Sequence, residues 1–413
     1  MKILIVQAKH FLNGSGGTEK ICSFLANGFV EMQHQVEIAT NENISGKAIF
    51  PLYDSIKVTN IYDSAIRQKL PIVYFNYEGK NPFLWIKFKL KKKYSKFLNK
   101  SIYEKESRKD EFYEFNLRQK SIAWKKYIDT IKPDLIVTMT IGSLLEISYQ
   151  NNYNIPIIDS VNGRPDHDFT DILWYRSEID MQSLKQSYEK LSGIQILFDS
   201  FKPFLPETFK GKSITIPNPI QQVESTDIVN HKIAKKRYKI CNVGSLVMSH
   251  KQQNITIEIF TEIAEKYPNW DLYFWGVGQD YEIIKYKIEK AKLENRIFLK
   301  GFTENPLEEL KKSDIYIFPS RHEGFPLALG EALSVGLPSL GFKNCPGVNE
   351  LIEHEKNGFL ANNQSELKNY LEKLIQNDEL RQQFGENGHL AMKKYAPKTV
   401  LKQWEAFIND LVK

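Results

Sequence analysis

The sequence is poor in cysteine and has no long apolar run, and each shortage excludes a class of protein. Its 413 residues include three cysteines, Cys22, Cys241 and Cys345, which are scattered and odd in number. We therefore expect neither a disulfide framework nor a cysteine-based zinc site. No apolar stretch approaches the roughly 20 residues of a membrane-spanning helix. The apolar run within residues 1–7 is too short for a secretory signal and is typical of a first buried strand. These features together favour a cytoplasmic protein.

The chain also lacks any recognised nucleic-acid-binding motif, although it is basic. Its net charge is +6, and residues 87–100 hold seven lysines and no acidic residue. Aromatic side chains are interleaved with these lysines. A basic, aromatic helix suits an anionic membrane surface or a nucleic-acid backbone, or it is a solvated lysine face whose aromatic side chains pack inward. Because no motif supports nucleic acid, we expect no such partner, and residues 83–100 remain a candidate membrane contact beside the solvated-face interpretation.

The most informative segment is residues 319–331, P-S-R-H-E-G-F-P-L-A-L-G-E. The apolar run at 314–318 directly before it has the length of a buried parallel strand. Gly324 and Pro326 indicate a turn, and Pro326 suits the first position of a helix, where a missing N–H costs nothing. The segment therefore predicts a strand, a tight turn and a helix.

Two carboxylates, Glu323 and Glu331, lie eight residues apart in this segment. The prediction places Glu323 in the turn and Glu331 about two turns into the helix. The free N–H groups of such a helix face the carboxyl end of the strand, where doubly wound sheets bind anionic ligands. An anion beside two carboxylates describes a phosphate next to hydroxyl groups, as in a sugar nucleotide.

The pattern E-G-F-P-x4-E, followed by A-L-S-V-G-L-P-S, resembles the E-x7-E signature of retaining glycosyltransferases of GT-B fold, family 4 (group 1 glycosyltransferases). Other stretches resemble the same family. The likeness spans nearly the whole chain, is most specific in 213–360 and is absent from 62–130. The matching stretches are G-G-T-E at 16–19, I-P-N-P at 216–219, the strand and G-x-G turn at 271–278, and G-V-N-E-L-I at 347–352.

The resemblance implies an α/β fold of GT-B type, with two Rossmann-like doubly wound domains facing a central cleft. The length of the chain also favours two domains. Apolar residues recur at helical spacing near the C-terminus, from Leu401 to Leu411. The implied division is an acceptor-binding domain at 1–220 with a helical, basic and aromatic insertion at about 62–130, a linker at 221–237, a nucleotide-sugar domain at 238–395, and a helix at 396–413 that crosses back to the first domain.

The resemblance also assigns a cation to the donor phosphates. In the family, an arginine follows the strand glycine and a lysine follows six residues later, and here Gly244 is followed by Ser245 and then by Lys251. Positive charge at this place stabilises the departing phosphate. The lysine is therefore present and the arginine is missing. Arg321 or His250 is expected to replace it, unless the donor has different phosphate needs.

Further donor contacts follow from the same likeness. Glu331 is expected to accept hydrogen bonds from the ribose hydroxyls, and Glu323 to lie by the hydroxyls of the donor sugar. Backbone amides of the glycine-rich loop and of the turn meet the phosphates and the sugar, although Pro326 has no N–H to donate. The expected catalytic residues are Lys251 and Glu323, and the expected donor-binding residues are Gly16, Gly17, Gly244, Ser245, Arg321, Gly324, Phe325, Pro326, Leu327 and Glu331.

The sequence patterns that indicate acceptor-binding residues are less specific. Asn162 stands where many family members have a histidine, and Arg164 either faces the acceptor or is a solvated loop residue. Asp166 and Asp168 form a D-x-D tripeptide, which holds a metal in GT-A enzymes. Two oxygen ligands at this spacing are common by chance, and the tripeptide lies in a loop of the expected acceptor domain. We therefore expect no metal and no cofactor, with a nucleotide sugar as co-substrate.

The resulting hypothesis is a retaining, metal-independent hexosyltransferase. It would move a hexose or N-acetylhexosamine from a nucleotide sugar, with UDP favoured, to a growing glycan, in assembly of a bacterial-type cell-surface polysaccharide such as lipopolysaccharide or capsule, or of a lipid-linked oligosaccharide at the cytoplasmic membrane face. The departing phosphate takes the acceptor proton, so no protein base is required. Two alternatives stay open: a GT-B sugar-nucleotide epimerase, and a non-catalytic subunit that binds sugar nucleotide or glycan, which Ser245 and Asn162 keep in view.

Overall fold

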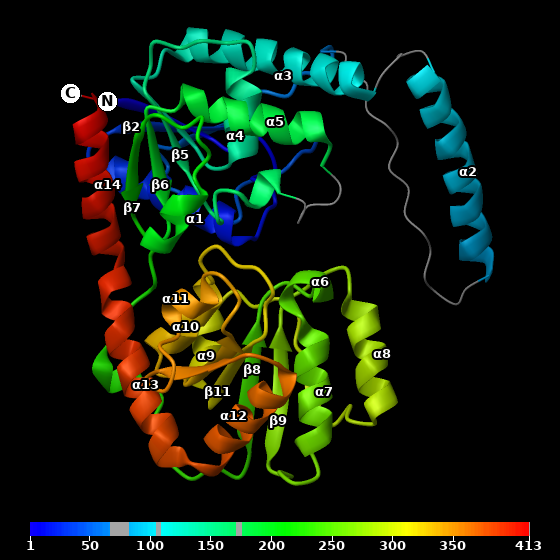
Figure 1. Ribbon diagram of the computed structural model, residues 1–413, viewed down its shortest axis with the longest axis vertical. Coiled ribbons are helices and arrows are strands. Elements are labelled where there is room, and N and C mark those ends of the chain that lie inside the picture. The colour runs from blue at the N-terminus through cyan, green and yellow to red at the C-terminus, as the bar shows by residue number, and fades with distance from the viewer. Residues whose placement is uncertain (67–81, 105–108, 171–175, 413) are drawn as a thin grey trace.

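The computed structural model describes residues 1–66, 82–104, 109–170 and 176–412. Within these ranges the chain forms two α/β domains, one above the other in Figure 1. The first domain holds a parallel seven-stranded sheet in the order β3-β2-β1-β4-β5-β6-β7. Its strands are β1 (Lys2–Val6), β2 (Gln35–Thr40), β3 (Lys57–Asn60), β4 (Leu135–Thr138), β5 (Ile157–Ser160), β6 (Gly193–Ile196) and β7 (Lys212–Thr215).

The second domain repeats this architecture with a parallel six-stranded sheet in the order β10-β9-β8-β11-β12-β13. The strands are apolar because helices cover both faces of a doubly wound sheet; all four residues of β11, for example, are buried. The strands are β8 (Tyr238–Val243), β9 (Trp270–Trp275), β10 (Ile297–Leu299), β11 (Ile315–Phe318), β12 (Ser339–Phe342) and β13 (Gly358–Ala361).

Both sheets reverse their strand order in the middle, at β1 and β4 in the first domain and at β8 and β11 in the second. The crevice outside the carboxyl ends of strands at such a switch point is where doubly wound folds bind ligands. The helices around the first sheet are α1 (Gly17–Glu31), α3 (Lys109–Ile131), α4 (Ile141–Ser148) and α5 (Glu178–Ser187), together with the short 3-10 turns η1 (His167–Phe169), η2 (Tyr188–Lys190) and η3 (Asp199–Phe204).

The second sheet has its own helices, and one more helix crosses between the domains. The helices are α6 (Met248–Lys251), α7 (Gln253–Ile263), α8 (Tyr281–Ala291), α9 (Pro306–Lys311), α10 (Leu327–Ser334), α11 (Val348–Leu351), α12 (Gln364–Gln376), α13 (Asp378–Met392) and α14 (Pro397–Val412). None of the described helices combines the length and the apolar character needed to cross a lipid bilayer.

Helix α14 joins the two domains, as predicted. After α13 has packed on the second domain, α14 runs along the first (Figure 1). Its Trp404 meets Phe29 of α1 edge to face, with 6.0 Å between the ring centroids. Leu401 fills the space above Gly28, where an added Cβ would come within 2.2 Å of its Cδ2. The apolar face of α14 is therefore part of the first domain's core.

The expected insertion at about 62–130 needs a correction. The second half of α3 is part of the first domain, because Trp124 and Ile128 are buried in its core and Lys120 donates a hydrogen bond of 2.5 Å to Glu146 of α4. Of the helices described in this range, α2 (Pro82–Glu104) is the one that stands apart from the domain (Figure 1). Residues 67–81 and 105–108 of the expected insertion lie outside the described residues.

Candidate functional site

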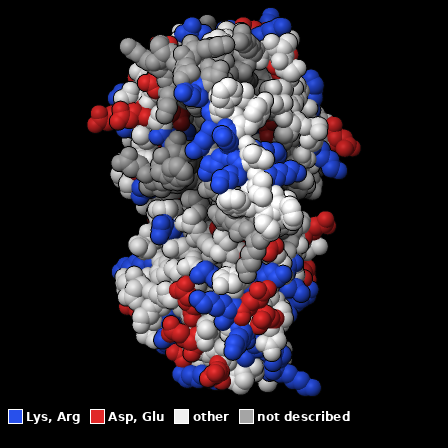
Figure 2. Space-filling view, turned by 90° about the vertical axis from the view of Figure 1, so that its right-hand side faces the viewer, with Lys and Arg blue, Asp and Glu red and all other residues white. Residues whose placement is uncertain are grey.

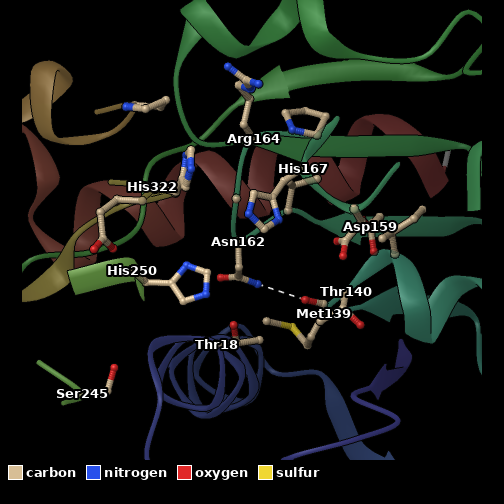
Figure 3. A pocket seen from close by; sticks show the side chains of 18 of the residues that line it. Thr18, Met139, Thr140, Asp159, Asn162, Arg164, His167, Ser245, His250 and His322 are labelled. Carbon is tan, nitrogen blue, oxygen red and sulfur yellow. Dashed lines mark hydrogen bonds between the residues drawn. The ribbon is translucent and has the colours of Figure 1, made fainter. Parts of the chain in front are cut away.

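A cavity of about 450 Å³ lies between the two domains. Its walls are the segments that follow the carboxyl ends of β4, β5, β8 and β11, together with the start of α1 (Figure 3). Both switch points therefore open onto one space. The lining residues include Thr18, Met139, Thr140, Asp159, Asn162, Arg164, His167, Asp168, Tyr188, Ser245, His250, Lys251, His322 and Glu323.

The domains touch at the turn that precedes α10. A Cβ placed on Gly324 would lie 2.0 Å from the carbonyl oxygen of Asn162, so this close approach requires glycine. The side chain of Asn162 donates hydrogen bonds to the carbonyl oxygens of Met139 (3.0 Å) and Ser160 (3.1 Å); the first bond is drawn in Figure 3. Asn162 is thus bonded to the backbone of its own domain.

Lys251 and Glu323, the two expected catalytic residues, form an ion pair of 2.6 Å. Lys251 ends the single turn of α6, and its ammonium lies 5.1 Å from the ring centroid of Phe318, at the end of β11. The lysine stem passes Gly244, since a Cβ there would lie 3.8 Å from Cε of Lys251, an ordinary contact distance. The exposed fractions of the side chains are 22% for Lys251 and 10% for Glu323. A partly buried cation therefore stands at the strand ends.

Helix α10 begins one residue later than predicted. Pro326 is the residue before the helix, and Glu331 is its fifth residue, little more than one turn from the start. Leu327 packs against the cores of both domains and contacts Gly17 at the start of α1. The ring of Phe325 stacks on Phe198, 5.3 Å between centroids, so this ring packs in the core while its backbone N–H remains the expected donor contact.

Glu331 is buried and accepts a hydrogen bond from Lys20 of α1. This ion pair crosses the domain boundary, and neither of its residues is among the described residues that line the cavity. Lys20 was not among the predicted site residues. No local signal identifies it, since the partners are 311 residues apart in the sequence.

The predicted glycine-rich loop is shorter than expected, because α1 already begins at Gly17. A Cβ on Gly16 would lie 2.4 Å from the carboxylate of Glu19, so a larger residue there would displace that carboxylate. Glu19 is buried, accepts a hydrogen bond of 2.7 Å from Gln7, and its pKa is raised by burial. Thr18 lines the cavity (Figure 3). The first turn of α1 therefore faces the cavity, and free N–H groups at a helix start bind phosphate well.

The two candidates for the missing arginine differ in position. His250 lines the cavity near Ser245 (Figure 3). Arg321 has an exposed side chain outside the cavity lining, and its backbone N–H donates to the carbonyl oxygen of His250 at 2.8 Å. Of the two candidates, His250 is the one in the cavity.

On the side of the first domain, Arg164 and both carboxylates of the D-x-D tripeptide are engaged. Arg164 donates two hydrogen bonds to Asp166, of 2.6 and 3.0 Å, and lies 4.2 Å from the ring centroid of Phe204. Asp168 accepts a hydrogen bond of 2.5 Å from Arg176. Within the described part of the chain, no group of three His, Cys, Asp or Glu side chains is placed to hold a metal ion.

The second domain resembles a known protein family. Residues 223–390 match the family described as glycosyl transferases group 1. They form a group 1 glycosyltransferase domain. An uncharacterized glycosyltransferase of Haemophilus influenzae is 32% identical over 219 residues, 52% of this chain and 60% of that protein. The poly(glycerol-phosphate) alpha-glucosyltransferase of Bacillus subtilis is 29% identical over 208 residues, 50% of this chain and 30% of that protein. Both alignments span less than two thirds of the relative.

A solved structure has the same fold over the full length. A TarM variant of S. aureus, crystallised with fondaparinux, alpha-GlcNAc-glycerol and UDP, superposes with a TM-score of 0.71 and 16% identity, covering all of this chain and 99% of that one. The fold of this chain is therefore GT-B, as predicted. Lys251, Glu323 and Glu331 all belong to the glycosyltransferase domain, and Lys20 reaches it from the other domain.

Three further residues that line the cavity were not predicted from the sequence. His167 of the first domain and His322 of the glycosyltransferase domain meet edge to face, 6.2 Å between centroids, and burial lowers the pKa of both. Asp159 near the end of β5 is buried, and burial raises its pKa to about 7. In the sequence these residues are lone histidines in loops and an aspartate near the end of a strand, so only the fold brings them together.

Proposed function

We propose that the protein transfers a hexose or N-acetylhexosamine from a UDP-sugar to a growing glycan, with retention of the anomeric configuration. The observation that carries the proposal is the Lys251–Glu323 pair in a cavity that the starts of α1 and α10 also approach. Support comes from the glycosyltransferase domain, from the UDP bound to TarM, and from the relative that glucosylates poly(glycerol phosphate). The product would belong to a cell-surface polysaccharide.

In this proposal the donor diphosphate lies between Lys251 and the first turn of α1. As the bond between the anomeric carbon and the phosphate oxygen breaks, negative charge develops on the leaving phosphate, and the lysine stabilises it. Lys251 would turn from Glu323 to the phosphate, which frees Glu323 for a hydroxyl of the donor sugar. The departing phosphate takes the acceptor proton. His250, in the cavity beside Ser245, would supply the donor that the missing arginine provides elsewhere.

The test of the function is UDP release. The full chain should release UDP from a UDP-hexose or UDP-N-acetylhexosamine faster when a glycan acceptor is added. An epimerase would convert the sugar nucleotide without releasing UDP. A binding subunit would bind UDP and release none from the sugar nucleotide.

Replacing Glu331 should weaken donor binding. Glu331→Gln keeps the shape of the side chain but removes the charge that both Lys20 and the ribose hydroxyls would use. We expect UDP affinity to fall roughly 10-fold or more, since a hydrogen bond to a charged group contributes about 1.5–3 kcal/mol. Calorimetric titration with UDP measures this change. Lys20→Met is the matched variant: if it lowers UDP affinity as much as Glu331→Gln does, the interdomain pair rather than the ribose contact explains the loss.

Transfer should not depend on a divalent cation. Asp166 and Asp168 are each engaged by an arginine, and Lys251 with the helix N–H groups supplies positive charge at the phosphates. We expect the rate of UDP release to stay within about twofold after treatment with EDTA. Loss of activity that manganese or magnesium restores would contradict the prediction.

We also propose that the acceptor is carried on a lipid and that α2 brings the protein to an anionic membrane. Five apolar side chains along one face of α2 are exposed, by 81% (Phe83), 49% (Ile86), 63% (Leu90), 63% (Tyr94) and 69% (Phe97). Their spacing of three or four residues places them on one stripe of the helix. We call this set the α2 stripe.

Lysines accompany the α2 stripe, and the helix has no acidic residue before Glu104. Figure 2 looks at this side of the molecule and shows basic side chains gathered with uncharged ones in its upper half. An exposed apolar stripe between lysines is typical of a helix that lies in the interface of an anionic membrane. A protein partner would instead need acidic side chains to match the lysines. This composition supports a peripheral protein of the cytoplasmic membrane face.

A further inference from the structure

Among the described residues, three carboxylates line the cavity, and two of them have cationic partners. Glu323 pairs with Lys251 and Asp168 with Arg176. Asp159, the third, has no basic group of the described residues within ion-pair distance, and its exposed fraction is 1%. Its hydrogen bond comes from the hydroxyl group of Thr138, at 2.5 Å.

A buried carboxylate without a cation costs free energy, so its presence in a cavity points to a ligand. Asp159 is the charged residue of β5, whose other residues are Ile157, Ile158 and Ser160. Asp159 lies on the far side of the cavity from Ser245 and His250, with Asn162 between them (Figure 3). Since Ser245 and His250 belong to the donor side, Asp159 faces the other substrate.

The charges around Asp159 limit what this substrate can carry. The described lining residue with a positive charge on that side is Arg164, and it is paired, because it donates two hydrogen bonds to Asp166. The charge of Asp168 raises the pKa of Asp159 further, which shows that the two carboxylates act on each other. A phosphate group would meet this negative potential without a free cation among the described lining residues, whereas a hydroxyl group donates readily to a carboxylate.

We propose that Asp159 binds the acceptor by accepting a hydrogen bond from one of its hydroxyl groups, in a subsite that selects an uncharged sugar over a polyol phosphate. The inference rests on the proposed glycosyl transfer and names the acceptor class for the same cavity. Thr138 orients the carboxylate from β4. His167 and Tyr188 complete this side of the cavity.

The test uses Asp159→Asn in the full chain, with methyl glycosides of glucose, galactose and N-acetylglucosamine as neutral acceptors and glycerol 3-phosphate as the anionic one. Loss of a hydrogen bond to a charged group should lower kcat/KM for the best neutral acceptor roughly 10- to 150-fold. UDP affinity, measured by calorimetry, should change less than twofold. The matched control is Asp199→Asn, since Asp199 is a carboxylate of the same domain whose side chain is 76% exposed.

The pH profile separates a substrate contact from a merely structural role. The pKa of Asp159 is raised to about 7, so the carboxylate forms as pH rises through 7 and the KM for the acceptor should fall there. Around it, the pKa of Tyr188 is raised and that of His167 lowered, both away from neutral pH, and Asp168 remains paired. Asp159→Asn should flatten this profile. Thr138→Val should move its midpoint upward, because the lost hydrogen bond favours the charged form.

Two results would overturn the inference alone: an unchanged acceptor KM and pH profile in Asp159→Asn, or faster transfer to glycerol 3-phosphate than to every neutral glycoside. If Asp159→Asn does not fold, an unchanged midpoint of the pH profile of the acceptor KM in Thr138→Val would also overturn the inference. Failure of the unaltered protein to release UDP from any sugar nucleotide would overturn the proposed function, and the inference with it.

Discussion

Replacing Lys251 by alanine is expected to lower turnover by roughly 10²- to 10³-fold, the range seen when one group that stabilises a developing oxyanion is removed. The affinity for UDP should fall much less, because the charge of the leaving phosphate is greatest after the bond to the sugar has begun to break. Initial rates of UDP release measure the turnover, and calorimetric titration measures the affinity for UDP.

The Lys251→Ala substitution also removes the ion-pair partner of Glu323. Without Lys251, the carboxylate of Glu323 loses its cation although its side chain is only 10% exposed, so part of the loss could come from Glu323 rather than from the phosphate. A double-mutant cycle with Glu323→Gln separates the two contributions. Lys300→Ala is the matched control, since Lys300 is an exposed lysine of the same domain outside the cavity. Equal losses in turnover and in UDP affinity would indicate uniform binding, and no loss in either would remove Lys251 from the site.

The fold was largely predictable because buried parallel strands are short apolar runs. The exceptions have physical causes. Strand β3, K-V-T-N, is an edge strand whose residues are exposed or half-buried, so it shows no apolar run. Strand β12, S-L-G-F, contains Gly341 because a Cβ there would lie 2.4 Å from Cγ1 of Val348. The position at the edge of the sheet decides the first case, and the contact with Val348 decides the second.

The candidate site was predictable where its signal is local. Lys251, Glu323 and Gly324 each belong to a short motif, and the structure brings all three to the cavity. The partner of Glu331 could not be found in this way, because Lys20 is on another domain. The sequence also could not decide between Arg321 and His250, which are 71 residues apart in number and adjacent in the fold. Sequence patterns identified residues on both walls of the interdomain cavity, such as Asn162 and Lys251, but their long-range partners needed the fold.

Charge reversal on α2 should release the protein from anionic vesicles. Lys87, Lys91 and Lys93 are exposed and lie to either side of the α2 stripe by helical geometry. Each lysine near an anionic surface contributes about 1 kcal/mol, so their loss alone corresponds to roughly 100-fold weaker binding. Replacement of all three by glutamate adds repulsion. Sedimentation with vesicles of phosphatidylglycerol and phosphatidylcholine measures the partition coefficient.

The contribution of the apolar side chains to vesicle binding is tested by a separate variant and is recognised by its salt dependence. Leu90→Asn with Phe97→Asn keeps every lysine, so binding should weaken while its dependence on salt persists; the charge-reversed variant should instead retain only weak, salt-insensitive binding. The matched control reverses Lys285, Lys290 and Lys292, which are exposed on or next to α8 of the glycosyltransferase domain. Transfer to a soluble acceptor should survive in all three variants, because no residue of α2 lines the cavity. If the unaltered protein binds phosphatidylcholine vesicles as well as anionic ones, or if the α8 control loses as much binding as the α2 variant, then α2 is a solvated helix and the acceptor reaches the cavity by another route.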